Sequence, residues 1–137
     1  MSMNLSEKIT PGLTREALMT TEVKDTAQII GSGTMPVLAT PAMAALMERA
    51  ASELAETLLP EGWTSVGTEL HIHHTAATPV GLPVRAIAIV TAVEGRKITF
   101  ELKAYDTIGE IGSGTHQRAI VEADRFLGKA QARRDKK

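Results

Sequence analysis

Two different spacings of hydrophobic residues divide the chain. Residues 40–59 carry an apolar stripe at helical spacing, made of Met43, Leu46, Met47, Ala50, Leu54 and Leu58. Thr40 is an expected N-cap and Pro41 suits the first helical turn. Pro60 and Gly62 are typical helix terminators. The pattern predicts one long amphipathic helix over residues 40–59.

After this helix the hydrophobic spacing changes to two, which is typical of β-strands. Residues 63–75 alternate, and the pattern predicts one face formed by Thr68, Leu70, Ile72 and His74. Residues 84–93 are apolar on both faces, as a central strand would be, whereas residues 97–105 alternate cleanly. Residues 110–122 are expected to form a last long strand. The short connections between these segments favour antiparallel neighbours.

The N-terminal part of the chain has weaker patterns. Residues 1–14 are polar and are interpreted as a lead-in, and residues 16–23 as a strand. Residues 24–39 contain Gly31, Ser32, Gly33 and Pro36 and are interpreted as a loop. Near the C-terminus, residues 126–134 are compatible with a short helix. One helix against one antiparallel sheet of about five strands is an α+β architecture.

Composition excludes several classes of protein. The chain has 137 residues, which suits a single domain over residues 1–137, and it has no Cys. Without Cys there is no disulfide, thiolate nucleophile or Cys-ligated metal site. The 3% aromatic content and the net charge of −1 argue against nucleic acid as a partner. No apolar segment approaches the roughly 18 residues of a transmembrane helix, so we expect a cytoplasmic protein with no membrane partner.

The charge is distributed unevenly along the chain. Residues 125–137 contain several Lys and Arg residues against Asp135 alone. We expect residues 130–137 to form a flexible basic tail. An alternative is that this end attracts an anionic ligand such as a nucleotide phosphate.

Glu48 is the first candidate for chemistry. Small apolar residues flank it on its own helical face, namely Ala44, Ala45, Ala51 and Ala55. A carboxylate shielded from water in this way could serve as a general acid or base. The alternative is that Glu48 borders the polar face of the helix and is solvated.

Histidines supply the other candidates. His74 shares the apolar strand face and is a candidate acid–base partner for an inward Glu48; the alternative is a core histidine bonded to a backbone carbonyl. His71 and His73 form an H-x-H pair with no third ligand at recognisable spacing, so no metal site is expected.

A glycine-rich segment, Gly112-Ser113-Gly114-Thr115-His116, lies in the last strand. It lacks the spacing of a phosphate-binding loop, and glycines within a strand favour close backbone approach instead. His116 and Arg118 would share one strand face. Arg118 could meet an anionic ligand or form a surface salt bridge.

Several strings in the chain carry a family resemblance. They are Ala39-Thr40, Leu46-Met47-Glu48, Gly67-Thr68, the segment H-T-A-A-T-P at 74–79, and the segment E-I-G-S-G-T-H at 110–116 together with Arg118. In order and spacing, residues 37–129 resemble the hotdog-fold thioesterases, and most closely their fluoroacetyl-coenzyme A thioesterase branch.

The resemblance implies a long helix wrapped by a curved antiparallel sheet, a homodimer with active sites near the subunit interface, and hydrolysis of acyl-coenzyme A without a cofactor. It places the catalytic hydroxyl on Thr40, the carboxylate on Glu48 and the imidazole on His74. It also implies that the substrate-binding residues are Gly67, Thr68, His116 and Arg118. Glu48 would activate water or attack the thioester directly, His74 would orient groups and shuttle the proton, and Thr40 would hold the reacting group.

Two alternatives to this enzyme remain at the level of sequence. One is a non-catalytic hotdog module that binds acyl-coenzyme A or another small ligand. The other is a hotdog hydratase, although the Asp and His spacing of that branch is not visible. One departure concerns the substrate: residues 24–39 hold no Phe, whereas the fluoroacetyl branch carries aromatic lid residues there. The acyl pocket is therefore expected to be more open or differently gated.

Overall fold

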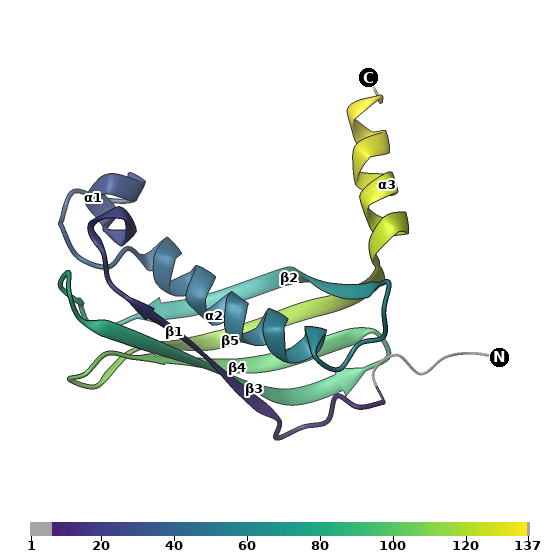
Figure 1. The fold of residues 1–137 in the computed structure, drawn as a ribbon, viewed down its shortest axis with the longest axis horizontal. Coiled ribbons are helices and arrows are strands. Elements are labelled where there is room, and N and C mark those ends of the chain that lie inside the picture. The colour runs from purple at the N-terminus through teal and green to yellow at the C-terminus, as the bar shows by residue number, and fades with distance from the viewer. Residues whose placement is uncertain (1–6, 137) are drawn as a thin grey trace.

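The computed structural model describes residues 7–136 and shows one long helix lying across a curled sheet (Figure 1). The elements in chain order are β1 (Thr14–Thr20), the 3-10 helix η1 (Val23–Asp25), α1 (Ala27–Ile30), α2 (Thr40–Glu56), β2 (Trp63–His74), β3 (Pro83–Glu94), β4 (Lys97–Tyr105), β5 (Glu110–Glu122) and α3 (Ala123–Arg134). The α+β architecture expected from the sequence is confirmed, with one helix on one sheet. The described residues include no helix of the length and apolarity that crossing a membrane requires. The single-domain interpretation stays a prediction.

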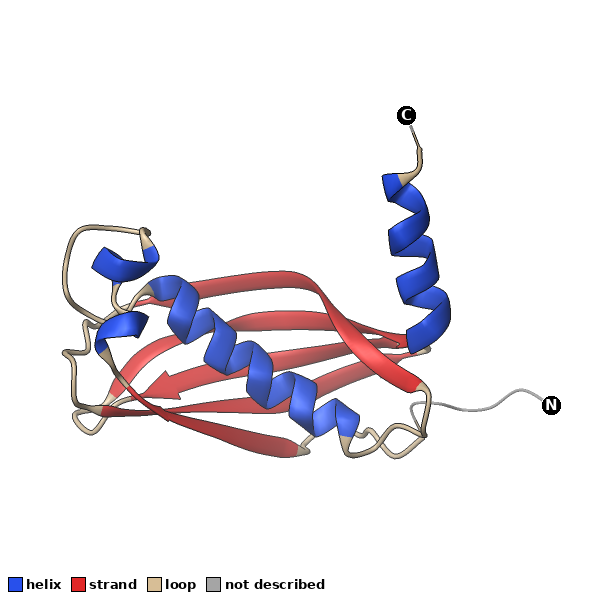
Figure 2. Ribbon diagram, turned by 45° about the horizontal axis from the view of Figure 1, so that its top comes forward, coloured by secondary structure: helices blue, strands red, loops and turns tan. Residues whose placement is uncertain are grey.

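All strand pairs are antiparallel, and the order across the sheet is β1-β3-β4-β5-β2. β3 is internal, as its apolar character on both faces predicts. β2 forms one edge of the sheet and β1 the other. The sheet curls around α2, so that the helix occupies its concave face (Figure 2).

Small side chains line the surface between α2 and the sheet. The buried residues of the helix are Met43, Leu46, Met47, Ala50, Ala51, Leu54 and Ala55. Opposite them the sheet buries Ala86, Ala88 and Val90 from β3 and Ile98, Phe100, Leu102 and Ala104 from β4. The alanines on both surfaces let the helix backbone come close to the sheet, and Phe100 is the largest of the fully buried side chains.

Four sequence-based assignments were wrong. The first strand is Thr14–Thr20, not 16–23, and the segment 24–39 is not a plain loop because it contains α1 and most of η1. Helix α2 ends at Glu56 instead of residue 59. The C-terminal helix begins at Ala123 and continues to Arg134, so much of the expected basic tail is helical.

Thr40 is not the N-cap of α2. The helix begins at Thr40 itself, and the capping position is taken by Ala39, whose side chain makes no capping hydrogen bond. Pro41 does lie in the first turn, as expected. The Thr40 hydroxyl is therefore free of the helix backbone, and it bonds elsewhere.

A β-bulge in β2 reverses which residues face the helix. The register against β5 shifts between Gly67 and Glu69, so Thr68 is an extra residue. Before the bulge, odd-numbered residues of β2 pair with even-numbered residues of β5, as Gly67 does with Arg118. After it, residues 70, 72 and 74 of β2 pair with residues 116, 114 and 112 of β5. Thr68 itself is exposed and donates a hydrogen bond to the Gln117 carbonyl oxygen at 3.1 Å. The sequence pattern put Thr68 on the helix-facing surface and missed this change of phase.

The glycines of β5 allow close packing, as the sequence suggested. A Cβ on Gly112 would lie 2.6 Å from the Met43 sulfur and 2.9 Å from the His73 carbonyl oxygen. A Cβ on Gly114 would collide with the His71 carbonyl oxygen. At Gly112 the helix and β2 both occupy the space of a side chain, and at Gly114 the atoms nearest to that space belong to β2.

Substituting Gly112→Ala is expected to lower the free energy of unfolding by about 1–3 kcal/mol, because Met43 and the β2 backbone must both shift. Gly109→Ala is the matched control. Its added Cβ meets no atom within 4 Å, and the free energy of unfolding should change by less than about 0.5 kcal/mol. Urea denaturation of both variants measures the difference, and equal stabilities would contradict the tight contact.

Candidate functional site

A cavity of about 340 Å³ lies at the N-terminal end of α2. Its lining residues are Ala27, Ser32, Val37, Leu38, Ala39, Thr40, His74, Thr75, Ala76 and Ala77. Within it, Thr40 Oγ1 and His74 Nδ1 are 2.8 Å apart. The hydroxyl that does not cap the helix is thus paired with the imidazole at the end of β2.

Backbone contacts hold this pair together. The Leu38 N–H donates to the Thr78 carbonyl oxygen at 2.9 Å, which ties the segment before Thr40 to the segment after His74. Thr78 is fully buried, and its hydroxyl donates to Asp106 Oδ2 at 2.8 Å. The H-T-A-A-T-P segment therefore has a structural part, carried by Thr78. Sequence reasoning did not assign the role of Thr78.

The environment of His74 favours the neutral imidazole. Desolvation by burial lowers the pKa of His74 below its ordinary 6.5, and contact with the Ala76 backbone offsets only part of that effect. A neutral ring can accept a hydrogen bond from the Thr40 hydroxyl at Nδ1 and carry its own proton on Nε2. Nε2 is buried and has no hydrogen-bond partner among the described residues.

Glu48 lies further along α2 and faces a different part of the sheet. Its side chain is 40% exposed, and Oε2 is 3.9 Å from His116 Nε2. A Cβ on Gly67 would be 2.9 Å from Oε2, so the carboxylate rests against bare backbone of β2. The apolar enclosure expected from the flanking alanines is wrong, because Ala45 is exposed, only Ala51 and Ala55 are buried, and the carboxylate extends toward polar groups.

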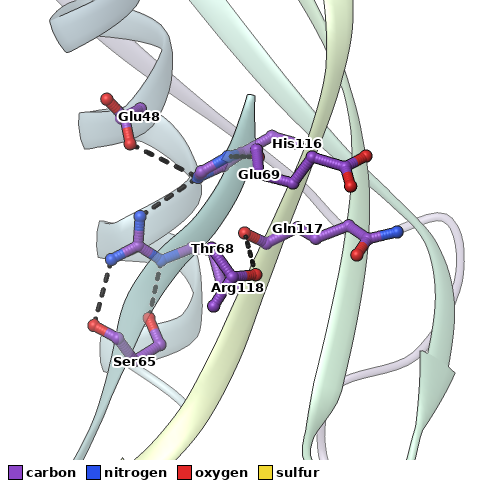
Figure 3. A network of polar contacts seen from close by, with 7 residues as sticks. All are labelled: Glu48, Ser65, Thr68, Glu69, His116, Gln117 and Arg118. Atoms are coloured by element: carbon purple, nitrogen blue, oxygen red, sulfur yellow. Dashed lines mark hydrogen bonds and ion pairs between the residues drawn. The ribbon is translucent and has the colours of Figure 1, made fainter. Parts of the chain in front are cut away.

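Arg118 is buried beneath Glu48 (Figure 3). It is 7% exposed, and its Nε donates to Ser65 Oγ at 2.8 Å while Nη2 donates to the Ser65 carbonyl oxygen at 3.0 Å. Burial lowers the pKa of Arg118, and the charge of Glu48 acts in the opposite direction. Arg118 is therefore not the surface ion pair that the sequence allowed. Ser65, which the sequence analysis missed, is its main anchor.

His116 connects Arg118 to the neighbouring strand. Its Nδ1 is 2.8 Å from the Glu69 carbonyl oxygen, and its Nε2 is 3.1 Å from Arg118 Nη1. Because a guanidinium can only donate, Nε2 must accept and Nδ1 must carry the proton. Desolvation by burial is the largest effect and lowers the pKa of His116; the hydrogen bond to the Glu69 carbonyl raises it, the Arg118 charge lowers it and the Glu48 charge raises it, with a net lowering. The ring is thus a neutral link in a polar cluster under the helix.

The sequence candidates fall into two groups, apart from Thr68, which is exposed and bonded to the Gln117 carbonyl oxygen. Thr40 and His74 form one group, and Glu48, Gly67, His116 and Arg118 form the other. Eight residues of helix separate Thr40 from Glu48, a rise of about 12 Å. Within one chain the hydroxyl–imidazole pair and the carboxylate are therefore not in contact. Among the described residues, no three His, Asp or Glu side chains gather where they could hold a metal ion.

Comparison with known proteins gives a consistent result. A model of the family described as fluoroacetyl-CoA-specific thioesterase matches residues 21–124. The fluoroacetyl-CoA thioesterase of Streptantibioticus cattleyicolor is 42% identical over 95 residues, which span 69% of this chain and 68% of that protein.

Solved structures agree with this match. A point mutant of the fluoroacetyl-CoA-specific thioesterase, in complex with fluoroacetate and CoA, superposes with a TM-score of 0.82 and 33% identity over 86% of this chain and 99% of that chain. A hot-dog-like protein from Thermanaerovibrio acidaminovorans gives a TM-score of 0.87 and 28% identity over 96% and 97% of the two chains. The hotdog fold expected from the sequence is confirmed.

Acidification is expected to destabilise the fold through His116. Because its pKa is lowered in the folded state, the unfolded chain takes up a proton at the ordinary 6.5 first, and stability falls as pH drops from about 7.5 to about 5.5. His116→Gln cannot titrate and should lose less stability over that interval. Urea unfolding at both pH values measures this, with the exposed His73→Gln as control. A His116→Gln variant with the full wild-type pH dependence would contradict the assignment.

Proposed function

The chain belongs to the fluoroacetyl-CoA-specific thioesterase family, and from this premise we propose that it hydrolyses a short or small acyl-CoA to the free acid and CoA. The observation that carries the proposal is the 2.8 Å contact between Thr40 Oγ1 and His74 Nδ1 inside a cavity. A hydroxyl, an imidazole and a carboxylate are groups that thioester hydrolysis can use.

Each group has a chemical part in the proposed reaction. The Thr40–His74 pair binds and orients the thioester carbonyl or the attacking water, and His74 passes a proton toward the leaving thiolate. Glu48 either takes a proton from the attacking water or attacks the carbonyl itself to give an anhydride that water then opens. In both routes the C–S bond breaks and the sulfur leaves as a thiol. The N-terminus of α2, where Thr40 lies, favours negative charge on the carbonyl oxygen.

A complete site needs Glu48 close to the Thr40–His74 pair, and one chain does not provide this. We propose that the partner's Glu48 completes the site in a homodimer. β2 is an edge strand with unpaired backbone groups, which a second copy can pair. Antiparallel pairing of the two β2 strands about an axis near Leu70 and His71 sets His74 opposite Gly67 of the partner subunit. Glu48 rests against Gly67, so the same axis carries the partner's carboxylate to His74.

The acyl pocket has small walls. Ala27, Ser32 and Val37 line the cavity from the segment before α2, and no Phe, Tyr or Trp is among its lining residues. Aromatic walls would press on a two-carbon acyl group, whereas these residues leave it room. We therefore propose weak discrimination between acetyl-CoA and fluoroacetyl-CoA, with some tolerance of longer acyl groups.

Thiol release from acetyl-, fluoroacetyl- and longer acyl-CoA tests the activity. Thr40→Ala, Glu48→Gln and His74→Ala should each lower kcat/KM by at least roughly 10²-fold, the usual scale for acid–base groups. Glu53→Gln on the same helix and His73→Ala on the opposite strand face are matched controls and should retain activity. If wild type turns over no thioester, the chain is a binding module. Full activity of Glu48→Gln would contradict the mechanism. A large preference for fluoroacetyl-CoA over acetyl-CoA would contradict the open pocket.

Mixed dimers test whether the site is shared. Thr40→Ala and Glu48→Gln, each inactive alone, should regain about a quarter of wild-type activity when refolded together in equal amounts. Half of those dimers are mixed, and each mixed dimer has one intact site.

The double variant mixed with wild type provides the control. A shared site leaves about a quarter of the activity, whereas independent subunits leave about half. A mixture of the two single variants that stays inactive would contradict the shared site.

A further inference from the structure

A second cavity, of about 490 Å³, lies at the other end of β2, where α3 leaves β5. Its lining residues are Trp63, Arg96, Ile120, Val121, Glu122, Arg125, Phe126 and Lys129. They come from the start of β2, the turn between β3 and β4, the end of β5 and the first turns of α3. The cavity contains none of the groups assigned to the reaction.

Its chemistry is that of a site for an anionic, flat molecule. Three cations, Arg96, Arg125 and Lys129, face one acid, Glu122. Two aromatic rings accompany them, and the Arg96 guanidinium lies 4.8 Å from the centre of the Trp63 ring. Phosphate groups pair with such cations, and a heterocyclic base stacks on such rings and guanidinium planes.

In the described structure, helix α3 has no evident function apart from lining this cavity. It stands away from the sheet (Figure 1), and none of its residues is buried. Arg125 and Lys129 are four residues apart and therefore lie on one face of the helix. Phe126, beside them, remains 44% exposed. The helix thus holds two cations and a ring at the cavity without help from the hydrophobic core.

We propose that this cavity binds the 3′-phosphoadenosine diphosphate end of the CoA thioester. The inference rests on the proposed function for the choice of ligand, and on charge complementarity for the site. Trp63 lies four residues from Gly67 on β2, about 13 Å along the strand. The extended pantetheine arm of CoA joins these two points, with the thioester at Gly67 and Glu48 and the nucleotide at Trp63. The nucleotide therefore sits on the subunit that supplies Glu48.

Trp63 provides a direct assay, because it is the one Trp in the sequence. Adenosine 3′,5′-bisphosphate, which lacks the thioester, should change wild-type tryptophan fluorescence in a saturable way. The double variant Arg125→Ala/Lys129→Ala should bind at least about tenfold more weakly, because two charge-assisted contacts are lost. Arg133→Ala/Arg134→Ala removes two charges from the same helix outside the cavity and should bind like wild type.

Kinetics gives a second readout. For acyl-CoA the Arg125→Ala/Lys129→Ala variant should raise KM about tenfold with little change in kcat, and added salt should narrow the difference from wild type. For the matching acyl-N-acetylcysteamine thioester, which has no nucleotide, the variant and wild type should be equal.

The outcomes separate this inference from the proposed function. Saturable fluorescence change that the cavity variant loses supports the nucleotide site even if no thioester is turned over. Absence of that change in wild type overturns it even if acyl-CoA is hydrolysed. Equal KM values for acyl-CoA in variant and wild type also overturn it. A smaller molar mass for the Arg125→Ala/Lys129→Ala variant than for wild type, measured by light scattering, also overturns the inference. It would mean that the cavity binds a second copy of the chain instead of a nucleotide.

Discussion

The close approach of α2 to the concave face of the sheet is the constraint on which the other features depend. Alanines on the helix and on β3, and the bare backbone of Gly112 on β5, make this approach possible. Every assigned group lies at this contact: Thr40 and Glu48 on the helix, and their partners on β2 and β5. A change of helix height over the sheet would therefore alter both ends of the site together.

Burying a guanidinium beneath the helix is costly unless its donors are satisfied. Arg118 meets that requirement through the side chain and carbonyl of Ser65 and through a neutral His116. Each nitrogen of the Arg118 guanidinium has a hydrogen-bond partner within the cluster. The partly exposed Glu48 carboxylate therefore lies beside a fixed positive charge and stays open to solvent. The same side chains thus satisfy the buried guanidinium and set the surroundings of the carboxylate that we propose takes part in the reaction.

β2 links the separate regions of the molecule. It carries His74 at one end, Gly67 near its middle and Trp63 at the other end, while its free edge faces outward. Because of the bulge at Thr68, Ser65 and Gly67 share the helix side of the strand with residues 70, 72 and 74. One strand therefore presents the proposed reacting groups, the proposed dimer edge and the proposed nucleotide cavity in a line.

The sequence by itself determined the elements whose signals are local. The apolar stripe of α2 and the alternation of β4 were sufficient to predict one helix on an antiparallel sheet, and the H-T-A-A-T-P and E-I-G-S-G-T-H strings were sufficient to indicate the family. Non-local contacts decided the rest. The local sequence predicts Thr40 as an N-cap, but in the structure its hydroxyl is hydrogen-bonded to His74, 34 residues away. The alanines around Glu48 predict an apolar enclosure, but in the structure His116 and Arg118 of β5 lie beside it. The one-residue bulge in β2 reverses the faces of the strand, and no local sequence pattern predicts it. Side-chain partners across the fold, not residue type or spacing, set these roles.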